Sequence, residues 1–536
     1  MAHRVLISDD LAQEGRDILA RYPSLQVDDR PGLKPAELIA AIPEYDALII
    51  RSGTKVTADV IAAAERLKVI GRAGIGVDNV DVPAATRRGI VVMNTPGGNN
   101  VTTAEHAISL LLSTARFIPQ ANASLRAGKW ERNKFTGSEV TGKTIGVVGL
   151  GNIGRIVADR ACGLQMKVIA YDPFVTAETK PLGTELVTLD ELFERADFVT
   201  VHVPFTADTK DLIDAKAIAK MKPGVRIINC ARGGIVDEQA LAAGIASGHV
   251  AGAAIDVFEV EPPPADHPLV GLPQVVATPH LGASTGEAQV NVAIAIAEQV
   301  AAFLERGTIS SAVNMPPLTA EQREFLGPFL TLAEKLGALA FQLGGIGTDT
   351  AASAPVEVAI EYSGNVVEQP TKAVTAALLR GLLVPILGND LNYVSAPILA
   401  RERGIRVEET TTAKPSDFRN RVAVRVKFAS GVEHSVAGAV FGQKIVRLVR
   451  LDDFFLEAVP DGYILMLYNR DVPGVVGRVG TLLGQNGVNI AGLELGRERI
   501  GGRAVSLFHV DDPVSESVLA ELRKFPEVIA AGLLHL

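Results

Sequence analysis

The stretch TIGVVGLGNIGR, residues 144–155, decides the fold of the central part of the chain. An apolar run leads into a turn with Gly149, Gly151 and Gly154, and a helix-forming segment follows. This glycine spacing between a strand and a helix is typical of turns that bind a dinucleotide pyrophosphate. The next apolar run ends in Asp172, whose carboxylate can accept the hydroxyls of an adenosine ribose. A carboxylate there would repel a 2′-phosphate, and no arginine follows directly, so we expect NAD rather than NADP.

Two α/β units stand in tandem. Four apolar runs in the first hundred or so residues end in glycine, serine or acidic residues, which is typical of parallel strands that lead into loops. A second series of six runs begins at Thr144 and alternates with helical segments. Between the two series, residues 99–116 predict a helix in which Thr102 and Glu105 can form a capping box. The pattern predicts an α/β protein with two doubly wound, Rossmann-like sheets.

Length and composition exclude several classes of protein. The 536 residues are too many for one hydrophobic core, so several domains are expected. A formal net charge of −9 argues against a general nucleic-acid or anionic-membrane partner. No uncharged apolar run reaches the length of about 18 residues that a membrane span needs. With only Cys162 and Cys230 and no apolar signal core, we expect a cytoplasmic protein, and no metal site is expected.

The character of the chain changes after the two prolines in NMPPLTAEQ, residues 314–322, which block continuation of the preceding helix. Residues 317–455 mix apolar strands with a helix near 371–387, which predicts an α+β domain. Residues 462–536 read strand, helix, strand, strand, helix, strand. That order predicts a small ferredoxin-like βαββαβ domain.

Three loops that follow apolar runs carry residues suited to oxidising an alcohol. The reaction needs a base for the hydroxyl proton, which suits histidine, and a cation for an acidic substrate, which suits arginine. Arg232 lies in NCARGGIVDE, Glu261 in DVFEVEPP and His280 in TPHLGAST. A carboxylate beside the histidine would favour its charged form and fix its tautomer. Taken singly, each is more often a surface or structural residue; we expect His106 and His202 to be structural.

These segments, together with GLGNIG, resemble the D-isomer-specific 2-hydroxyacid dehydrogenases over residues 1 to about 316. The resemblance implies that Arg232 holds the substrate carboxylate. It implies that His280 is the acid and base of the reaction and that Glu261 is its partner. Oxidation of a 2-hydroxy acid with NAD is therefore the expected activity.

The resemblance also implies a split arrangement of domains. The NAD-binding domain, residues 99–286, would be inserted into a substrate-binding domain made of residues 1–98 and 287–316. Beyond the glycines and Asp172, it implies cofactor contacts from Asn152, Ile153, Val203, Pro204, Cys230, Ala231, Asp256, His280, Gly282 and Ala283. At Ile75, where relatives often have a threonine, only a backbone contact is expected.

The N-terminal segments IIRSGTKVT, IGRAGIGVDNVD and NTPGGNN are most similar to the family members that act on 3-phosphoglycerate. We therefore expect oxidation of 3-phosphoglycerate to 3-phosphohydroxypyruvate, the first step of serine synthesis. A phosphorylated substrate needs cations beyond Arg232. The expected contacts are Arg51, Ser52, Gly53, Arg72 and Arg132, with Lys134 as a weaker candidate. Arg132 would reach the site of a neighbouring subunit, and each of these cations could equally be a solvated charge.

The C-terminal segment resembles an ACT domain, a regulatory module that binds small ligands such as amino acids. Asn469, Asp471 and Asn489 are the expected effector contacts, with L-serine as the effector held between paired domains. An assembly module without a ligand is the alternative. Residues 317–455 resemble the intervening domain of the long members of the family, and the added domains favour a homotetramer. We interpret the late basic residues Lys444, Arg447 and Arg450 as solvated surface.

Two other functions are compatible with the same motifs. One is a 2-hydroxyacid dehydrogenase that acts on glyoxylate, hydroxypyruvate or 2-oxoglutarate, although an ACT-like segment favours amino-acid synthesis. The other is an NAD-sensing binding protein, since corepressors built on this fold keep the catalytic motifs. Such corepressors lack an ACT-like segment, which argues against that alternative.

Overall fold

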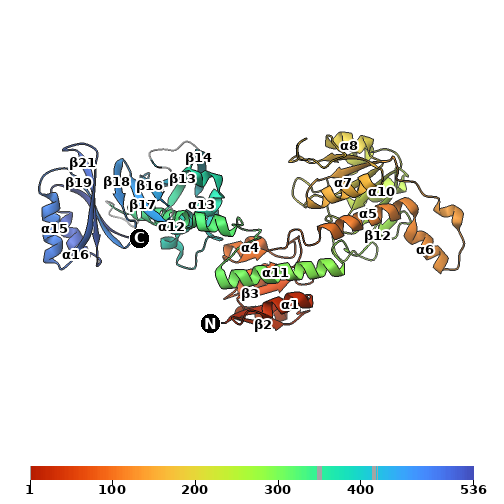
Figure 1. The fold of residues 1–536 in the computed structure, drawn as a ribbon, viewed down its shortest axis with the longest axis horizontal. Helices are drawn as coiled ribbons and strands as arrows, with labels where there is room; N and C mark the ends of the chain where they lie inside the picture. Colours follow the sequence, from red (N-terminus) through yellow and green to blue (C-terminus); the bar gives the residue numbers. More distant parts are fainter. Residues whose placement is uncertain (1, 347–352, 413–417, 419, 443) are drawn as a thin grey trace.

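The computed structural model describes residues 2–346, 353–412, 418, 420–442 and 444–536. These residues form four β-sheets that follow one another along the chain, with helices packed against each (Figure 1). Two parallel sheets come first, then a mixed sheet and a small antiparallel sheet, which confirms the predicted fold class. Within the described residues, no helix combines the length and the apolar character needed to cross a membrane.

The first sheet has the strand order β2-β1-β3-β4-β5, and all its pairs are parallel. Its elements are β1 (His3–Ile7), α1 (Gln13–Ala20), β2 (Leu25–Asp29), α2 (Pro35–Ala41), η1 (Ile42–Glu44), β3 (Ala47–Ile50), α3 (Ala58–Ala63), β4 (Val69–Arg72), α4 (Val82–Arg87) and β5 (Val91–Met93). The long helix α11 (Gly286–Arg306) returns to this sheet and shares one hydrophobic core with it. A Cβ at Gly71 would lie 2.7 Å from Val300 on α11, so glycine permits this close approach.

The second sheet has the order β12-β11-β10-β9-β6-β7-β8, again with parallel pairs throughout. Its elements are α5 (Asn100–Arg116), α6 (Ile118–Arg126), η2 (Arg132–Phe135), β6 (Thr144–Val148), α7 (Asn152–Gly163), β7 (Lys167–Tyr171), β8 (Thr184–Leu186), α8 (Leu189–Arg195), β9 (Phe198–Val201), α9 (Ala215–Lys220), β10 (Val225–Asn229), α10 (Glu238–Ala246), β11 (Val250–Ile255) and β12 (Val275–Ala277). The order reverses between β6 and β9, the place where open α/β sheets bind ligands.

The mixed sheet has the order β14-β13-β15-β16-β17-β18. Its elements are α12 (Ala320–Leu343), β13 (Pro355–Gly364), η3 (Asn365–Glu368), α13 (Thr371–Leu387), α14 (Ala396–Glu402), β14 (Arg406–Thr412), β15 (Asn420–Phe428), β16 (Glu433–Phe441), β17 (Ile445–Leu451) and β18 (Phe454–Ala458). Glycines allow α12 and α13 to pack closely, since a Cβ at Gly337 would lie 2.1 Å from the carbonyl oxygen of Leu378.

The last sheet has the order β20-β21-β19-β22 with antiparallel pairs. Its elements are β19 (Tyr463–Arg470), α15 (Val475–Gln485), β20 (Ile490–Arg497), β21 (Arg503–Val510), α16 (Glu516–Leu522) and β22 (Val528–His535). One face of this sheet packs against α15 and α16. The other face carries Ile464, Met466 and Leu507 into the same core as α12 and the mixed sheet.

Local details differ from the sequence expectations. The helix predicted over 99–116 begins at Asn100, so Thr102 lies inside its first turn and its hydroxyl pairs with Thr285 at 3.3 Å instead of capping the helix. The expected capping box with Glu105 is therefore wrong. Two short strands, β2 and β8, also join the edges of the parallel sheets at positions where no strand was expected.

Candidate active site

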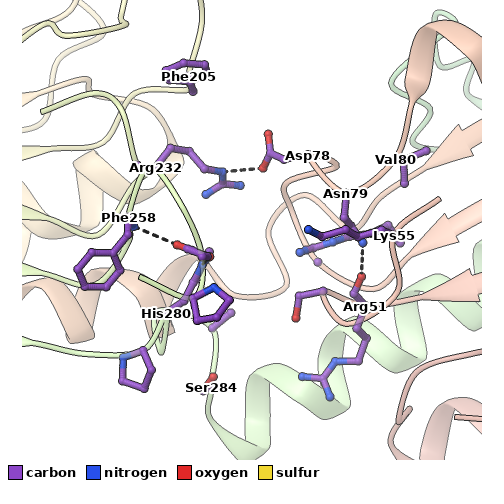
Figure 2. Close-up of a pocket in the computed structure, with 18 of the residues that line it drawn as sticks. Arg51, Lys55, Asp78, Asn79, Val80, Phe205, Arg232, Phe258, His280 and Ser284 are labelled. Carbon is purple, nitrogen blue, oxygen red and sulfur yellow. Dashed lines mark hydrogen bonds and ion pairs between the residues drawn. The ribbon is translucent and has the colours of Figure 1, made fainter. Parts of the chain in front are cut away.

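A cavity of about 1210 Å³ lies between the two parallel-sheet units. The ends of strands β3, β4, β10, β11 and β12 and the loops that follow them line it, and they bring Arg51, Arg72, Arg232, Glu261 and His280 around one space. Figure 2 shows Arg51, Arg232 and His280 among the lining residues. The carboxyl ends of parallel strands meet at one edge of each sheet, which explains why residues far apart in sequence come together here.

His280 and Glu261 form a direct pair on the NAD-binding side of the cavity. The Nδ1 atom of His280 lies 2.8 Å from Oε2 of Glu261. The other carboxylate oxygen accepts the backbone N–H of Phe258 at 3.1 Å. Burial alone would raise the pKa of Glu261, but the hydrogen bonds from His280 and Phe258 outweigh it and the pKa is lowered. An ionised Glu261 holds the proton on Nδ1 and leaves Nε2 of His280 available to a substrate.

The fully buried Asp256 fixes the loop that carries His280 through hydrogen bonds. Its carboxylate accepts the Thr278 hydroxyl at 2.6 Å and the backbone N–H groups of Leu281 and Gly282 at 2.7 and 2.8 Å. His280 itself has a left-handed backbone with a φ of 57°. The structure thus gives Asp256 a role in loop geometry. The expected contact between Asp256 and the nicotinamide carboxamide stays a prediction.

The two histidines expected to be structural have protein partners. The Nε2 atom of His106 lies 3.1 Å from the carboxylate of Asp256. His202 bonds the Thr200 hydroxyl at 2.9 Å, and burial lowers its pKa to about 4. Neither residue lines the cavity described above.

Arg232 enters the cavity from the loop after β10. Its Nε donates to Asp78 at 2.8 Å across the space between the two units, and its Nη1 donates to the carbonyl of Ala231 at 2.6 Å (Figure 2). Asn229 fixes the loop, because its side chain donates to the carbonyl of Arg232 and accepts the N–H of Ala231. The guanidinium therefore has a defined position at the mouth of the NAD-binding unit.

Two further arginines, Arg51 and Arg72, line the cavity from the first sheet. The carboxylate of Asp9 accepts the backbone N–H of Arg51 at 2.6 Å and so fixes the loop after β3. The side chain of Arg72 is mostly buried, and its Nε has no hydrogen-bond partner. Burial, followed by repulsion from Arg232, lowers the pKa of Arg72 to about 10. A buried cation with a free donor indicates a place for an anion.

The remaining expected substrate contacts are distributed differently. Ser52 lines the cavity, whereas Gly53 packs beside Asp9, whose Oδ1 would lie 2.6 Å from a Cβ at that position. Arg132 and Lys134 lie on η2, outside the lining of the cavity, and Lys134 pairs with Glu131 at 2.6 Å. Within one chain, the structure does not bring Arg132 to the site.

The glycine turn after β6 has the geometry that a dinucleotide requires. Gly149 has a φ of 93°, which favours glycine. A Cβ at Gly154 would lie 1.9 Å from the carbonyl of Gly149, so helix and turn pack without room for a side chain. At Gly151, by contrast, no protein atom lies within 4 Å of a Cβ position. Helix α7 begins there without a side-chain cap, which leaves N–H donors and open space for a pyrophosphate.

Several expected cofactor contacts surround this turn. Asp172 follows β7 and accepts the backbone N–H of Leu150 at 2.8 Å, so its carboxylate sits at the turn. His202 and Val203, the start of the segment with Pro204, pack against Gly149. Cys230 is buried, and Ala283 lines the cavity. The carbonyl of Ile75 accepts a hydrogen bond from the side chain of Asn94. The other expected residues nearer the cavity are Ala231 and Gly282. These residues fit an NAD molecule that lies along the carboxyl edge of the sheet.

Sequence reasoning missed Asp78, Asn229, Lys55 and Asn79. Lys55 lines the cavity, and Asn79 donates to the carbonyls of Arg51 and Thr54 at 2.7 Å. All four lie within seven residues of an expected arginine, Asn229 at the end of β10 and the other three in loops.

The expected effector residues do not meet within one chain. Asn469 is buried and accepts the Ser506 hydroxyl at 2.8 Å. Asp471 lies beside Arg497 and the N–H of Gly501. Asn489 donates to Asp511 at 2.7 Å. The register of β19, β20 and β21 puts Asn489 at the opposite end of the sheet from the other two.

Comparison with protein families identifies three segments of the chain. Residues 108–282 match the NAD binding domain of the D-isomer specific 2-hydroxyacid dehydrogenases. Residues 325–452 match the D-3-phosphoglycerate dehydrogenase intervening domain, and residues 463–527 match the ACT domain. The NAD-binding domain establishes NAD as the cofactor of this chain and its activity class as that of an NAD-dependent oxidoreductase.

Full-length relatives agree with this domain order. The chain is 46% identical to D-3-phosphoglycerate dehydrogenase of Archaeoglobus fulgidus over 99% of this chain and all of the relative. It is 47% identical to the enzyme of the same name from Synechocystis, over 97% of this chain and 92% of the relative.

Two solved structures each cover somewhat more than half of this chain. A glyoxylate reductase from Paecilomyes thermophila has a TM-score of 0.54 at 30% identity and covers 58% of this chain and 98% of its own. A formate dehydrogenase from Staphylococcus aureus in complex with NAD has a TM-score of 0.52 at 28% identity, over 56% of this chain and 95% of its own.

Proposed function

The chain belongs to the D-3-phosphoglycerate dehydrogenase family, and from this premise we propose that it oxidises the C2 hydroxyl of D-3-phosphoglycerate to 3-phosphohydroxypyruvate, the first step of serine synthesis. The observation that carries the proposal is that the His280–Glu261 pair and three arginines line one cavity. A base with a fixed tautomer serves the hydroxyl, and separate cations serve a substrate that carries two anionic groups.

The chemistry divides between the cofactor and the chain. NAD, when bound, supplies the carbon that accepts the hydride from C2. His280 takes the hydroxyl proton on Nε2, and the C2–O bond becomes a carbonyl. Glu261 accepts the Nδ1–H of His280 at 2.8 Å, which stabilises the imidazolium formed by that transfer. In the reverse direction, His280 returns the proton to the oxygen.

The arginines divide the substrate between them. Arg232 lies on the NAD-binding side near His280, so it holds the carboxylate next to C2. Arg51 and Arg72 lie on the opposite wall and receive the phosphate. Arg72 supports this division, because it is a mostly buried cation that lines the cavity beside the like charge of Arg232, and a doubly charged anion offsets that repulsion.

The test measures NADH oxidation with 3-phosphohydroxypyruvate, hydroxypyruvate, glyoxylate and 2-oxoglutarate. We expect the highest kcat/KM with the phosphorylated acid. Arg72→Gln should remove that preference and leave the rate with hydroxypyruvate nearly unchanged. Preference of the wild-type chain for an unphosphorylated acid would overturn the substrate assignment.

A reductase for unphosphorylated 2-oxo acids is the second candidate function. It is supported by the likeness to a glyoxylate reductase over the dehydrogenase part. The same four substrates decide between the two candidates. An absence of turnover with all four would favour the NAD-sensing alternative.

The ACT domain supports regulation by a small molecule, and we propose L-serine as the effector in a homotetramer. Asp471 and Asn489 lie at opposite ends of one small sheet, so a site that uses both needs two paired domains. Titration of serine against the NADH assay, with Asn489→Ala as the comparison, tests the effector. Unchanged activity over a wide range of serine concentrations would overturn it. We keep the cytoplasm as the proposed compartment, on the strength of the two free cysteines.

A further inference from the structure

Asp78 and Arg232 join the two walls of the cavity. Asp78 lies in the loop after β4, and Arg232 lies in the loop after β10. Their carboxylate and guanidinium are 2.8 Å apart, and the bond spans the open space between the units (Figure 2). Asp78 is 71% exposed and Arg232 30% exposed, so the arginine is the anchored member and the aspartate reaches toward it.

Asp78 binds the edge of the Arg232 guanidinium that a substrate carboxylate would also bind. Nη1 already donates to the carbonyl of Ala231, which uses one end of the guanidinium. Nε donates to Asp78, and Nη2 lies 1.9 Å from where a Cβ of Gly76 would be. The Nε–Nη2 edge therefore faces the loop of residues 76–78. A carboxylate binds arginine best through two such parallel donors.

Asp78 is also the acid that balances the cationic cavity. It opposes the repulsion of Arg72 by Arg232 and Arg51, since it acts to raise the pKa of Arg72 while they act to lower it. Three other acids line the cavity, Asp81, Glu259 and Glu261, and two of them hold other groups. Asp81 caps α4 by accepting the N–H of Ala84, and Glu261 holds His280.

We propose that Asp78 occupies the place of the substrate carboxylate on Arg232 in the free enzyme. The substrate must displace Asp78 when it binds. The inference rests on the proposed function only in taking Arg232 as the carboxylate-binding residue. Asp78 keeps the arginine ordered and paired in the free enzyme, and it raises KM for the hydroxy acid because it competes for the same donors. A neutral amide at this position can still accept from Nε, but it holds the donor more weakly because the charge is gone.

The experiment compares Asp78→Asn with the wild-type chain and with Glu65→Gln, an exposed carboxylate of the same domain outside the cavity. Both variants remove one negative charge. We expect Asp78→Asn to lower KM for 3-phosphoglycerate about three- to fivefold, since the pair is partly screened by water. The kcat and the KM for NAD should change less than twofold, and Glu65→Gln should match the wild type.

Binding without turnover provides the independent arm. Calorimetry with 3-phosphoglycerate and with D-glycerate, which lacks the phosphate, should show tighter binding to Asp78→Asn for both acids. A merely damaged site would bind both more weakly. If Asp78 instead orients Arg232, the variant raises KM and weakens both dissociation constants, and the proposal is overturned. The substrate preference of the wild-type chain tests the proposed function on its own. The comparison with D-glycerate tests the role of Asp78 whether or not the substrate carries a phosphate.

Discussion

A single short contact, between Nδ1 of His280 and Oε2 of Glu261, sets the chemical character of the cavity. The contact works because the N–H of Phe258 and the histidine together keep Glu261 ionised despite its partial burial. Sequence motifs were sufficient to name these two residues and Arg232. They did not single out Asp78, because closeness in sequence to Arg72 does not by itself distinguish an exposed aspartate from other surface charges.

Replacing His280 and replacing Glu261 should lower the activity by different factors. His280→Ala should lower kcat by about 10²- to 10⁴-fold, since it removes the group that receives the proton. Glu261→Gln should lower kcat/KM by about 10- to 100-fold, because the base remains but its tautomer is no longer fixed. The double variant should be little worse than His280→Ala. Steady-state NADH formation measures all three, with the exposed Glu194→Gln as the charge control; additive losses would contradict the pair.

Because of His202, we expect the stability of the NAD-binding domain to decrease at acidic pH. Burial lowers its pKa from the usual 6.5 to about 4, so between these values the unfolded chain binds more protons than the folded one. The free energy of unfolding is therefore full above pH 6.5 and falls as the pH falls toward 4. The loss at pH 5 should be roughly 2 kcal/mol.

Thermal unfolding followed at pH 7 and pH 5 checks this prediction. His202→Asn cannot titrate and should lose correspondingly less stability between the two values. His249→Asn is the matched control and should keep the wild-type dependence. Equal losses for the wild type and His202→Asn would show that other groups cause the acid sensitivity.

Some helices and strands could be predicted from the sequence better than others. The strands of the two parallel sheets are continuous apolar runs, because both faces of such sheets are covered, and these were predicted. The edge strands β2 and β8 were missed since LQVDD and TEL mix acidic residues with few apolar ones. The N-cap of α5 was assigned to Thr102 instead of Asn99, because asparagine and threonine share the preference for that position.

The glycine turn and helix α7 predict two opposite phenotypes. Gly154→Ala puts a methyl group against the Gly149 carbonyl, so it should lower the free energy of unfolding by roughly 2–4 kcal/mol. Gly151→Ala meets no protein atom and should change stability by less than about 1 kcal/mol. It should nevertheless raise KM for NAD by about tenfold or more, because the added methyl group takes the space of the pyrophosphate.

Thermal unfolding and NAD titration of both variants separate these effects. Gly163→Ala, at the far end of the same helix and also in open space, is the control for NAD binding. If Gly151→Ala binds NAD as the wild type does, the pyrophosphate does not lie at the start of α7.

At the scale of the whole molecule, the chain consists of two catalytic units followed by two accessory domains that share a core. The sequence indicated a ferredoxin-like end segment but not what covers its sheet. In β19, Leu465 and Leu467 face the helices α15 and α16, whereas Ile464 and Met466 face α12 and the mixed sheet. A continuous apolar run shows that both faces of a strand are buried, but not which partner buries each.

That shared core limits how the gene can be shortened. A chain cut after residue 316 loses α12 and both accessory sheets together, and of the cores of the two parallel sheets it loses only the buried Val394, which packs in the core of the first sheet and α11. We expect it to be recovered as a folded protein. A chain cut after residue 460 removes Ile464, Met466 and Leu534 from the core around α12, so we expect it to aggregate and to bind hydrophobic dyes. Recovery of the 460-residue chain as a monodisperse protein would contradict this. The two accessory domains are therefore expected to be stable only together, so a truncation has to keep both or remove both.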